Sequence, residues 1–227
     1  MKSIFIKILV TILVISGLCA LLQFSGILSC TYISTNNLMP SLKKGGFVFS
    51  SGIKSYTYNN IVCFKSKDFK TGKSTIEILR IAGMPGDTIE LNDGYLLRNG
   101  FFADDINKLM FRYDVKKKLI NDSQFFKKLL IYPEIEKDTV HFYLSKNEFK
   151  TIGMNYLLHK YHSKINFAFC NKASIDNSDN KNQFACLIIV PEDSCFLLGD
   201  NRDQCVDSRD FGFVASKNII STILFLH

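Results

Sequence analysis

Residues 198–212 of this 227-residue chain read LGDNRDQCVDSRDFG, and this stretch is the most informative part of the sequence. It follows an apolar, strand-like run and brings opposite charges together at short spacing, from Asp200, Arg202, Asp207 and Arg209. The planar guanidinium of arginine matches a carboxylate with two parallel hydrogen bonds. The pattern therefore predicts a polar loop that is fixed against the body of a domain. The plainer alternative is a solvated surface loop, whose ion pairs contribute little to stability.

Two further segments stand out upstream. Residues 79–87, LRIAGMPGD, are typical of a strand that enters a Pro-Gly turn. In such a turn Gly86 can adopt positive φ and Asp87 can hydrogen-bond the backbone. Residues 37–42 read NLMPSL and follow a long apolar run.

Together the three segments resemble bacterial signal peptidase I, the membrane-bound serine endopeptidase of the S26 type. Residues 199–212 are similar to the family's GDNR…S-x-DSR-x-FG signature, residues 79–87 to its KR-x-x-G-x-PGD segment, and residues 37–40 to its S-M-x-P segment. The resemblance covers about residues 1–100 and 185–227, and the order and spacing of the segments agree. It implies a mostly β fold, with a signal-peptidase-like antiparallel β domain, an inserted accessory subdomain and one preceding transmembrane helix.

The resemblance implies that this chain retains a framework of residues at the positions that match the family motifs. These framework residues are Met39, Pro40, Arg80, Gly83, Pro85, Gly86, Asp87, Gly199, Asp200, Asn201, Arg202, Cys205, Asp207, Ser208, Arg209 and Gly212.

The resemblance fails at the positions of the chemistry. The family uses a Ser–Lys dyad, in which a lysine made neutral by desolvation takes the proton of the serine. The serine would stand at Asn37, the lysine at Leu79, and a serine that supports the lysine at Cys205. An amide does not attack a peptide bond as a hydroxyl does, and leucine has no titratable group. The resemblance thus implies a member with no intact catalytic residue, although Thr35 could still assist an oxyanion hole.

A relocated site is the alternative. The hydroxyls nearest to Asn37 are Ser34, which needs a three-residue shift of the loop, and Ser41, for which a structural role is the plainer interpretation. Lys73 lies six residues before Leu79, so in one strand both side chains would point to the same face. Six strand residues span about 20 Å, so Lys73 would be too far from the Leu79 position for a hydrogen bond there. Three histidines lie in the inserted region: His141, His159 and His162.

Residues 8–28 contain no charged side chain, and about 20 helical residues cross a bilayer core. Lys2 and Lys7 precede this run, so the positive-inside rule places the N-terminus in the cytoplasm and the main domain on the outer face of the bacterial plasma (inner) membrane. The alternatives are a cleaved export signal and lipoprotein processing at residues 27–30. In the family an apolar surface near the nucleophile loop dips into the bilayer, so Leu38 and Met39 are expected near the lipid headgroups.

The region after the membrane run divides into a core and an insertion. Residues 31–100 and 185–227 are expected to form the β core, and residues 101–184 an inserted cap with a helix near 114–130 and an exposed loop over 171–183. Hairpin turns are predicted at Asn92-Asp93-Gly94 and Arg98-Asn99-Gly100. The strand-like runs are 47–49, 61–64, 75–81, 88–91, 185–191, 194–198 and 219–226.

Composition limits the partners. The formal net charge is +7, which suits anionic lipid headgroups as well as nucleic acid, and the apolar N-terminus favours lipid. Because the apolar N-terminus accounts for the basic charge through lipid, we expect no nucleic-acid partner. The seven cysteines form no CxxC pair, so we expect no metal site, and we expect no cofactor.

Three functions remain open. The first is an inactive, signal-peptidase-like membrane protein that binds signal peptides of exported pre-proteins or regulates an active paralogue. The second is an active endopeptidase with an unconventional site. The third is a structural envelope protein that retains only the fold.

Overall fold

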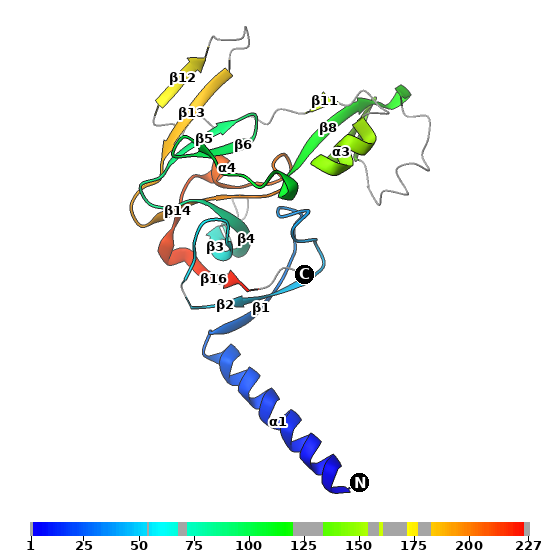
Figure 1. Cartoon of the computed structure of the whole chain (residues 1–227), viewed down its shortest axis with the longest axis vertical. Helices are drawn as coiled ribbons and strands as arrows, with labels where there is room; N and C mark the ends of the chain where they lie inside the picture. Colours follow the sequence, from blue (N-terminus) through cyan, green and yellow to red (C-terminus); the bar gives the residue numbers. More distant parts are fainter. Residues whose placement is uncertain are drawn as a thin grey trace.

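The computed structural model describes residues 2–53, 55–67, 72–119, 134–153, 159–160, 172–176 and 183–224. It shows one long helix attached to a body built from three antiparallel sheets (Figure 1). The strand content confirms the expected mostly β fold. The helical elements outside the sheets are α1 (Lys2–Phe24), α3 (Lys146–Gly153), α4 (Ser208–Phe211), and the short 3-10 turns η1 (Ile106–Lys108), η2 (Lys117–Leu119) and η4 (Ser216–Asn218).

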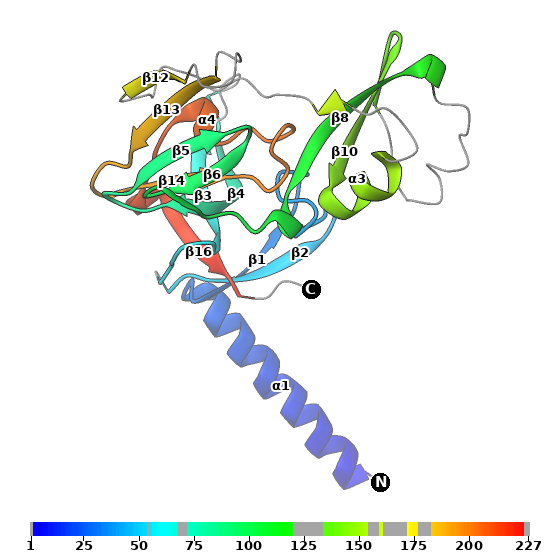
Figure 2. The same ribbon diagram turned by 45° about the horizontal axis from the view of Figure 1, so that its top comes forward.

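Helix α1 is apolar all round and projects away from the domain, with none of its span from Ser3 to Phe24 buried (Figure 2). By length and composition it is long enough to cross a bilayer. It begins earlier than the predicted range 8–28 and also ends earlier. The helix ends where Gly26, at φ 72°, closes the last turn with a hydrogen bond from its N–H to the carbonyl of Gln23. Leu28, expected in the helix, instead begins the first strand.

The largest sheet has seven strands in the order β1-β2-β16-β3-β4-β14-β15 and holds the motif segments. Its β4 and β14 are the runs that precede the two longer motifs. One face buries a cluster of apolar side chains that includes Val62, Leu79, Ile81 and Leu197. The strands are β1 (Leu28–Tyr32), β2 (Phe47–Ser51), β3 (Ile61–Lys67), β4 (Ser74–Gly83), β14 (Ser194–Leu198), β15 (Val214–Ala215) and β16 (Ile219–Ile223).

A five-stranded sheet in the order β12-β13-β5-β6-β7 packs beside it through a second apolar cluster that includes Ile89, Leu96 and Phe196. Both predicted hairpin turns are present, and Asp93 and Asn99 adopt positive φ there, as these turns require. The strands are β5 (Thr88–Asn92), β6 (Tyr95–Arg98), β7 (Phe101–Phe102), β12 (Lys172–Asp176) and β13 (Gln183–Ile189). Because β7 and β12 pair here, residues 101–102 and 172–176 of the expected insertion belong to this sheet, and β12 lies where a loop was predicted.

The third sheet, in the order β11-β8-β10-β9, lies wholly within residues 101–184 and confirms an accessory β-subdomain. The predicted helix near 114–130 is wrong over 114–119, because alternate residues of β8 are buried, as in a half-buried strand, and η2 follows. The rest of that range lies outside the described residues. Helix α3 packs on this sheet, with the ring of Phe149 stacked on Tyr113. The strands are β8 (Met110–Lys116), β9 (Glu134–Glu136), β10 (Thr139–Ser145) and β11 (His159–Lys160).

Candidate functional site

Leu79, the position at which the sequence predicted the family's lysine base, is 1% exposed. It belongs to the apolar cluster on the inner face of β4, together with Ile81 and Cys205, and Met84 packs against this cluster. An amine in such a cluster would be desolvated, which is the environment that lowers the pKa of a lysine. The surroundings of this position would therefore suit a neutral lysine, but the side chain that occupies it is leucine, which has no titratable group.

Asn37, Gly199 and Cys205 converge beside this cluster. A Cβ on Gly199 would lie 2.3 Å from Cys205 Sγ and 2.7 Å from the backbone oxygen of Asn37, so only glycine fits between them. The Asn37 carbonyl accepts a hydrogen bond from the Asn201 N–H at 3.0 Å. Cys205 thus shares the apolar cluster of Leu79 and lies, across Gly199, near the backbone oxygen of Asn37.

Cys205 itself is no replacement nucleophile. Burial raises the pKa of its thiol well above the ordinary value, and the negative charge of Asp207 raises it further. Its Sγ lies 3.5 Å from the carbonyl of Val206. Because the thiolate is the reactive form of cysteine, this raised pKa disfavours Cys205 as a nucleophile.

Arg80 and Asp200 fix the loop that carries Asn37. Arg80 donates from Nε to Asp200 Oδ1 at 2.7 Å and from Nη2 to Oδ2 at 2.6 Å. The Ser41 hydroxyl donates to the same carboxylate at 2.6 Å, and Arg80 Nη1 donates to the carbonyl of Asn59. Ser41 is thus held in a structural role, as the plainer interpretation of its sequence position suggested. The neighbouring Met39-Pro40 bond is cis.

Asp207 and Arg209 form a second, fully enclosed pair. Arg209 donates from Nε and Nη2 to the two oxygens of Asp207, both at 2.8 Å. Asp207 also accepts from the Gly199 N–H and caps α4. The positive φ of Gly212 ends this helix, and the Ser208 hydroxyl accepts from the Leu197 N–H at 2.9 Å. The charged loop is therefore an internal brace, and the alternative of a solvated surface loop is wrong.

Arg202 joins this loop to the five-stranded sheet. It donates to the carbonyls of Gly199 and Gly94, and its Nη2 lies 2.5 Å from Asp104 Oδ1. Asp104 was not found by sequence analysis, because no motif marks it. Asn201 is 1% exposed and its Oδ1 has no partner among the described residues, which is costly for a buried polar atom.

The turn of the second motif is also built as predicted. Gly86 has φ 82°, and Asp87 accepts hydrogen bonds from the Met84 N–H and the Asn99 side chain, both at 2.8 Å. Pro85 lies in the turn. A Cβ on Gly83 would lie 2.7 Å from Ile89, so this glycine permits close packing between the two sheets.

Thr35 and Ser34 lie in the chain that leads from β1 to Asn37. Thr35 is half-buried and Ser34 is exposed. Lys73, also considered as a base, is exposed just before β4. None of these three side chains is placed beside Leu79 by the contacts of the described residues.

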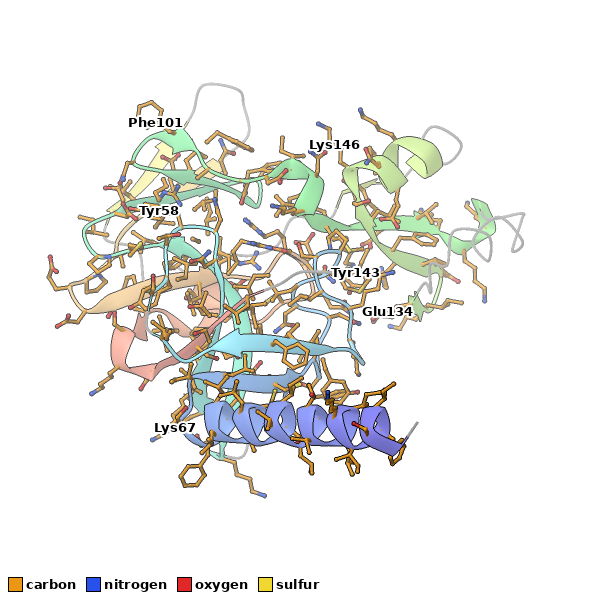
Figure 3. The ribbon with its side chains drawn as sticks, turned by 60° about the horizontal axis from the view of Figure 1, so that its bottom comes forward. Tyr58, Lys67, Phe101, Glu134, Tyr143 and Lys146 are labelled. Carbon is orange, nitrogen blue, oxygen red and sulfur yellow. The ribbon has the colours of Figure 1, made fainter. Side chains whose placement is uncertain are left out.

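The inserted sheet contacts the charged loop directly. The Arg112 N–H of β8 donates to Asp203 at 2.8 Å, and Gln204, next to Cys205, donates to Glu134 of β9 at 3.2 Å. Tyr143 also donates to Glu134, and the two lie on neighbouring strands in Figure 3. The cap is thus joined to the charged loop that carries the framework residues from Gly199 to Gly212.

His141, weighed as a base, is engaged within the cap. Its Nδ1 lies 2.7 Å from Asp114 Oδ1, and Arg112 Nη2 lies 2.8 Å from the same nitrogen. Burial raises the pKa of Asp114, but the hydrogen bonds from Arg112 and His141 outweigh burial and lower it overall. The backbone of His159 pairs with Asp114 from β11, whereas its side chain and His162 lie outside the described residues.

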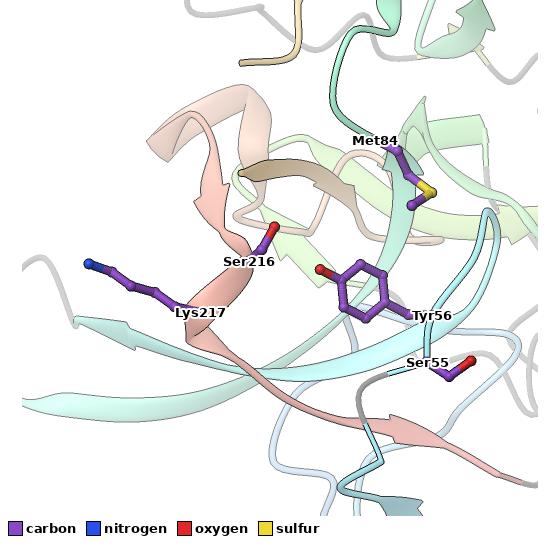
Figure 4. A pocket seen from close by; sticks show the side chains of 5 residues that line it. All are labelled: Ser55, Tyr56, Met84, Ser216 and Lys217. Carbon is purple, nitrogen blue, oxygen red and sulfur yellow. The ribbon is translucent and has the colours of Figure 1, made fainter. Parts of the chain in front are cut away.

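A cavity of about 580 Å³ lies near the inner-face cluster. Figure 4 shows its lining residues, Ser55, Tyr56, Met84, Ser216 and Lys217. Tyr56 and Met84 pack against the cluster that holds Leu79, but neither Asn37 nor Leu79 lines the cavity. The cavity is therefore separate from the position of the family's dyad.

Along part of one edge, β4 pairs with none of the strands that the structure describes. Residues 74–80 pair with β3 on one side, whereas β14 covers the other edge from Arg80 to Gly83. Among the described strands, none pairs with that other edge between Ser74 and Leu79. Such an edge can accept an extended peptide as an added strand.

Comparison with known proteins agrees with these motifs. The sequence matches the family described as signal peptidase, peptidase S26, over residues 4–227. It is 32% identical over 217 residues to signal peptidase I of Buchnera aphidicola subsp. Baizongia pistaciae, covering 86% of this chain and 67% of that protein. It is 30% identical to signal peptidase I of Buchnera aphidicola subsp. Schizaphis graminum, covering 83% and 64%. The chain thus spans about two thirds of the length of these relatives.

Among solved structures, a signal peptidase I from Enterococcus faecalis aligns with 76% of this chain and 99% of its own, at 20% identity and a TM-score of 0.37. The signal peptidase I relatives and the apolar helix α1 indicate a membrane-anchored protein. Because the family match extends over almost the whole sequence, this chain belongs to the signal peptidase family, peptidase S26.

Proposed function

We propose that this chain is a non-catalytic member of its family that binds signal peptides of exported pre-proteins, or regulates an active paralogue, without cleaving them. The observation that carries the proposal is the state of Leu79. It is buried in an apolar cluster whose neighbour Cys205 holds a protonated thiol, so the position offers no base.

The framework around this position supports binding rather than decay. The pairs Arg80–Asp200 and Asp207–Arg209 remain complete, and Asn201 still holds the backbone of Asn37. Selective loss of the reacting groups, with the surrounding contacts kept, is what a binding protein that has lost catalysis would show. The edge of β4 from Ser74 to Leu79, with which no described strand pairs, gives an extended peptide a place to bind next to Leu79.

The proposal also requires the β domain to lie on the side of the membrane where signal peptides emerge. Lys2 and Lys7 lie at the start of α1, and under the positive-inside rule they support a cytoplasmic N-terminus, with the β domain on the outer face of the bacterial plasma membrane. Signal peptides emerge on that face after export begins, so the β domain would meet them there.

Site-directed photocrosslinking tests this function. A photoreactive residue at Ile76, which is 54% exposed on β4, is expected to capture a signal peptide in the full-length membrane protein. The matched control carries the same residue at Lys146, at the start of α3, and should capture none. Equal capture at both positions, or none at Ile76, would contradict peptide binding, and release of a cleaved pre-protein would favour an active enzyme.

A further inference from the structure

The β1–β2 hairpin is fastened to the end of the membrane helix. Only residues 25–27 join α1 to β1. The Gly52 N–H donates to the Ile27 carbonyl at 3.0 Å, and a Cβ on Gly52 would lie 1.9 Å from the Gly26 oxygen. Figures 1 and 2 both show β1 and β2 at the side of the domain from which α1 emerges. The hairpin therefore begins at the boundary of the bilayer.

One face of this hairpin presents aromatic side chains outward. The register pairs Tyr32 with Phe47 and Cys30 with Phe49, so these four side chains share a face, which we call the hairpin face. Tyr32, Phe47 and Phe49 are 51%, 68% and 52% exposed, and the Tyr32 and Phe47 rings lie 5.3 Å apart. Aromatic side chains are enriched at the headgroup layer of membranes.

This placement corrects the predicted membrane contact. Leu38, expected near the headgroups, is 3% exposed and packs with Ile33 and Leu42 inside the domain. Met39 is half-buried. The chain folds back after β1, so Leu38 is enclosed in the domain and the exposed aromatic side chains near the end of α1 are those of the hairpin face.

Two lysines extend the hairpin face at its far end. The backbone ladder continues beyond the Tyr32–Phe47 pair, with bonds between Ile33 and both Gly45 and Gly46. The turn just before these glycines carries Lys43 and Lys44, both exposed and without a salt bridge to any residue of the described chain.

We propose that Lys43 and Lys44 bind the phosphates of anionic phospholipids, so that the hairpin face docks preferentially on an anionic leaflet. An ammonium group binds phosphate as a point charge, and the two lysines stand beside aromatic rings suited to the same layer. Each lysine near such a surface contributes about a fivefold factor to association, and the two together about 30-fold. This surface is distinct from the position of the dyad and is independent of whether the chain cleaves peptides.

The test uses the full-length protein in lipid nanodiscs. Because the chain has no tryptophan, Phe47→Trp supplies a single fluorescent reporter on the hairpin face. Lipids brominated near the headgroup should quench this reporter several-fold more strongly in bilayers that contain phosphatidylglycerol than in pure phosphatidylcholine. The difference should vanish in high salt, where the screening length falls to about 3 Å.

The matched variants decide the role of the lysines. Lys43→Gln/Lys44→Gln should abolish the preference for phosphatidylglycerol, whereas Lys146→Gln/Lys150→Gln on α3 should preserve it. A reporter at Phe101, which Figure 3 shows on the side away from α1, should remain unquenched in every bilayer. Equal quenching in the two bilayers, or a preference that survives the loss of Lys43 and Lys44, would overturn the proposal.

Discussion

Arg80 and Asp200 are joined by two parallel hydrogen bonds, at 2.7 and 2.6 Å, although 120 residues separate them in sequence. The same carboxylate accepts from Ser41, so one ion pair connects β4, the loop after β14 and the loop that carries Asn37. These contacts around the loop are therefore complete, although the position at which the sequence predicted the family's nucleophile carries an amide.

The buried Arg209–Asp207 pair should be essential for stability. Arg209→Ala leaves Asp207 without its partner at 0% exposure, and breaking such a pair costs about 3–5 kcal/mol. Chemical unfolding of the two proteins measures the difference. The control Lys108→Ala removes an exposed pair with Asp105 and should change stability by less than about 1 kcal/mol. An unchanged midpoint for Arg209→Ala would contradict the internal brace.

Gly199 should not tolerate a side chain. Gly199→Ala places a methyl group within 2.3 Å of Cys205 Sγ, and overpacking of this kind typically costs about 1–3 kcal/mol. Gly46→Ala is the matched control, because its nearest contact would be an ordinary 3.5 Å. Thermal unfolding of both variants tests this, and equal melting temperatures would contradict the close approach of Asn37 and Cys205.

The Cys205 thiol predicts a loss of stability in alkali. Burial raises its folded-state pKa above the unfolded value of about 8.5, so the unfolded chain gives up this proton first. The stabilisation is complete below that unfolded value and is lost as pH rises through the folded pKa. Between about pH 7.5 and 9.5, one unit on either side of that reference pKa, the free energy of unfolding should fall less for Cys205→Ala than for the unmodified protein. Parallel pH profiles would contradict the shift.

Topology can be read from introduced cysteines in a variant that lacks Cys30, because Cys30 lies on the hairpin face proposed to contact lipid. Lys146 is exposed at the start of α3, so a membrane-impermeant maleimide added outside should label Lys146→Cys. A cysteine introduced at Ser3 in a variant lacking Cys30 should react only after the membrane is opened. Labelling of Ser3→Cys in sealed cells would reverse the proposed orientation.

The sequence predicted features that depend on neighbouring residues. Asn92-Asp93-Gly94 specifies its turn through backbone conformations that Asp and Gly adopt readily, and the turn forms as expected. The run at 8–28 predicted a membrane helix, but its end was missed because Ile27 and Leu28 are as apolar as the helix itself. Gly26 provides the stop, and glycine within a spanning helix is too ordinary to mark one.

Features that depend on distant contacts were missed. Nothing local distinguishes Leu38 as buried, since the neighbours that cover it come from β2, β3 and β4. Asp104 becomes part of the site only through Arg202, 98 residues away. By contrast, the proximity of Cys205 to Leu79 and to the backbone of Asn37 was predictable, because the motifs that surround them specify one arrangement.

The central claim is that this chain does not cleave pre-proteins, because Asn37 supplies no nucleophile and Leu79 supplies no base. Losing one member of a coupled pair costs about as much as losing both, on the order of a million-fold. Asn37→Ser alone should therefore restore nothing, whereas Asn37→Ser with Leu79→Lys is expected to regain weak cleavage that Cys205→Ser improves.

The most direct measurement is incubation of the purified, unmodified protein with a pre-protein in detergent, followed by mass analysis of the products. We predict that the pre-protein stays intact in that sample and is cleaved at its signal sequence only by the variants that carry both Ser at 37 and Lys at 79. Cleavage by the unmodified protein that Ser34→Ala or Ser41→Ala abolishes would contradict the account and show that the nucleophile has moved.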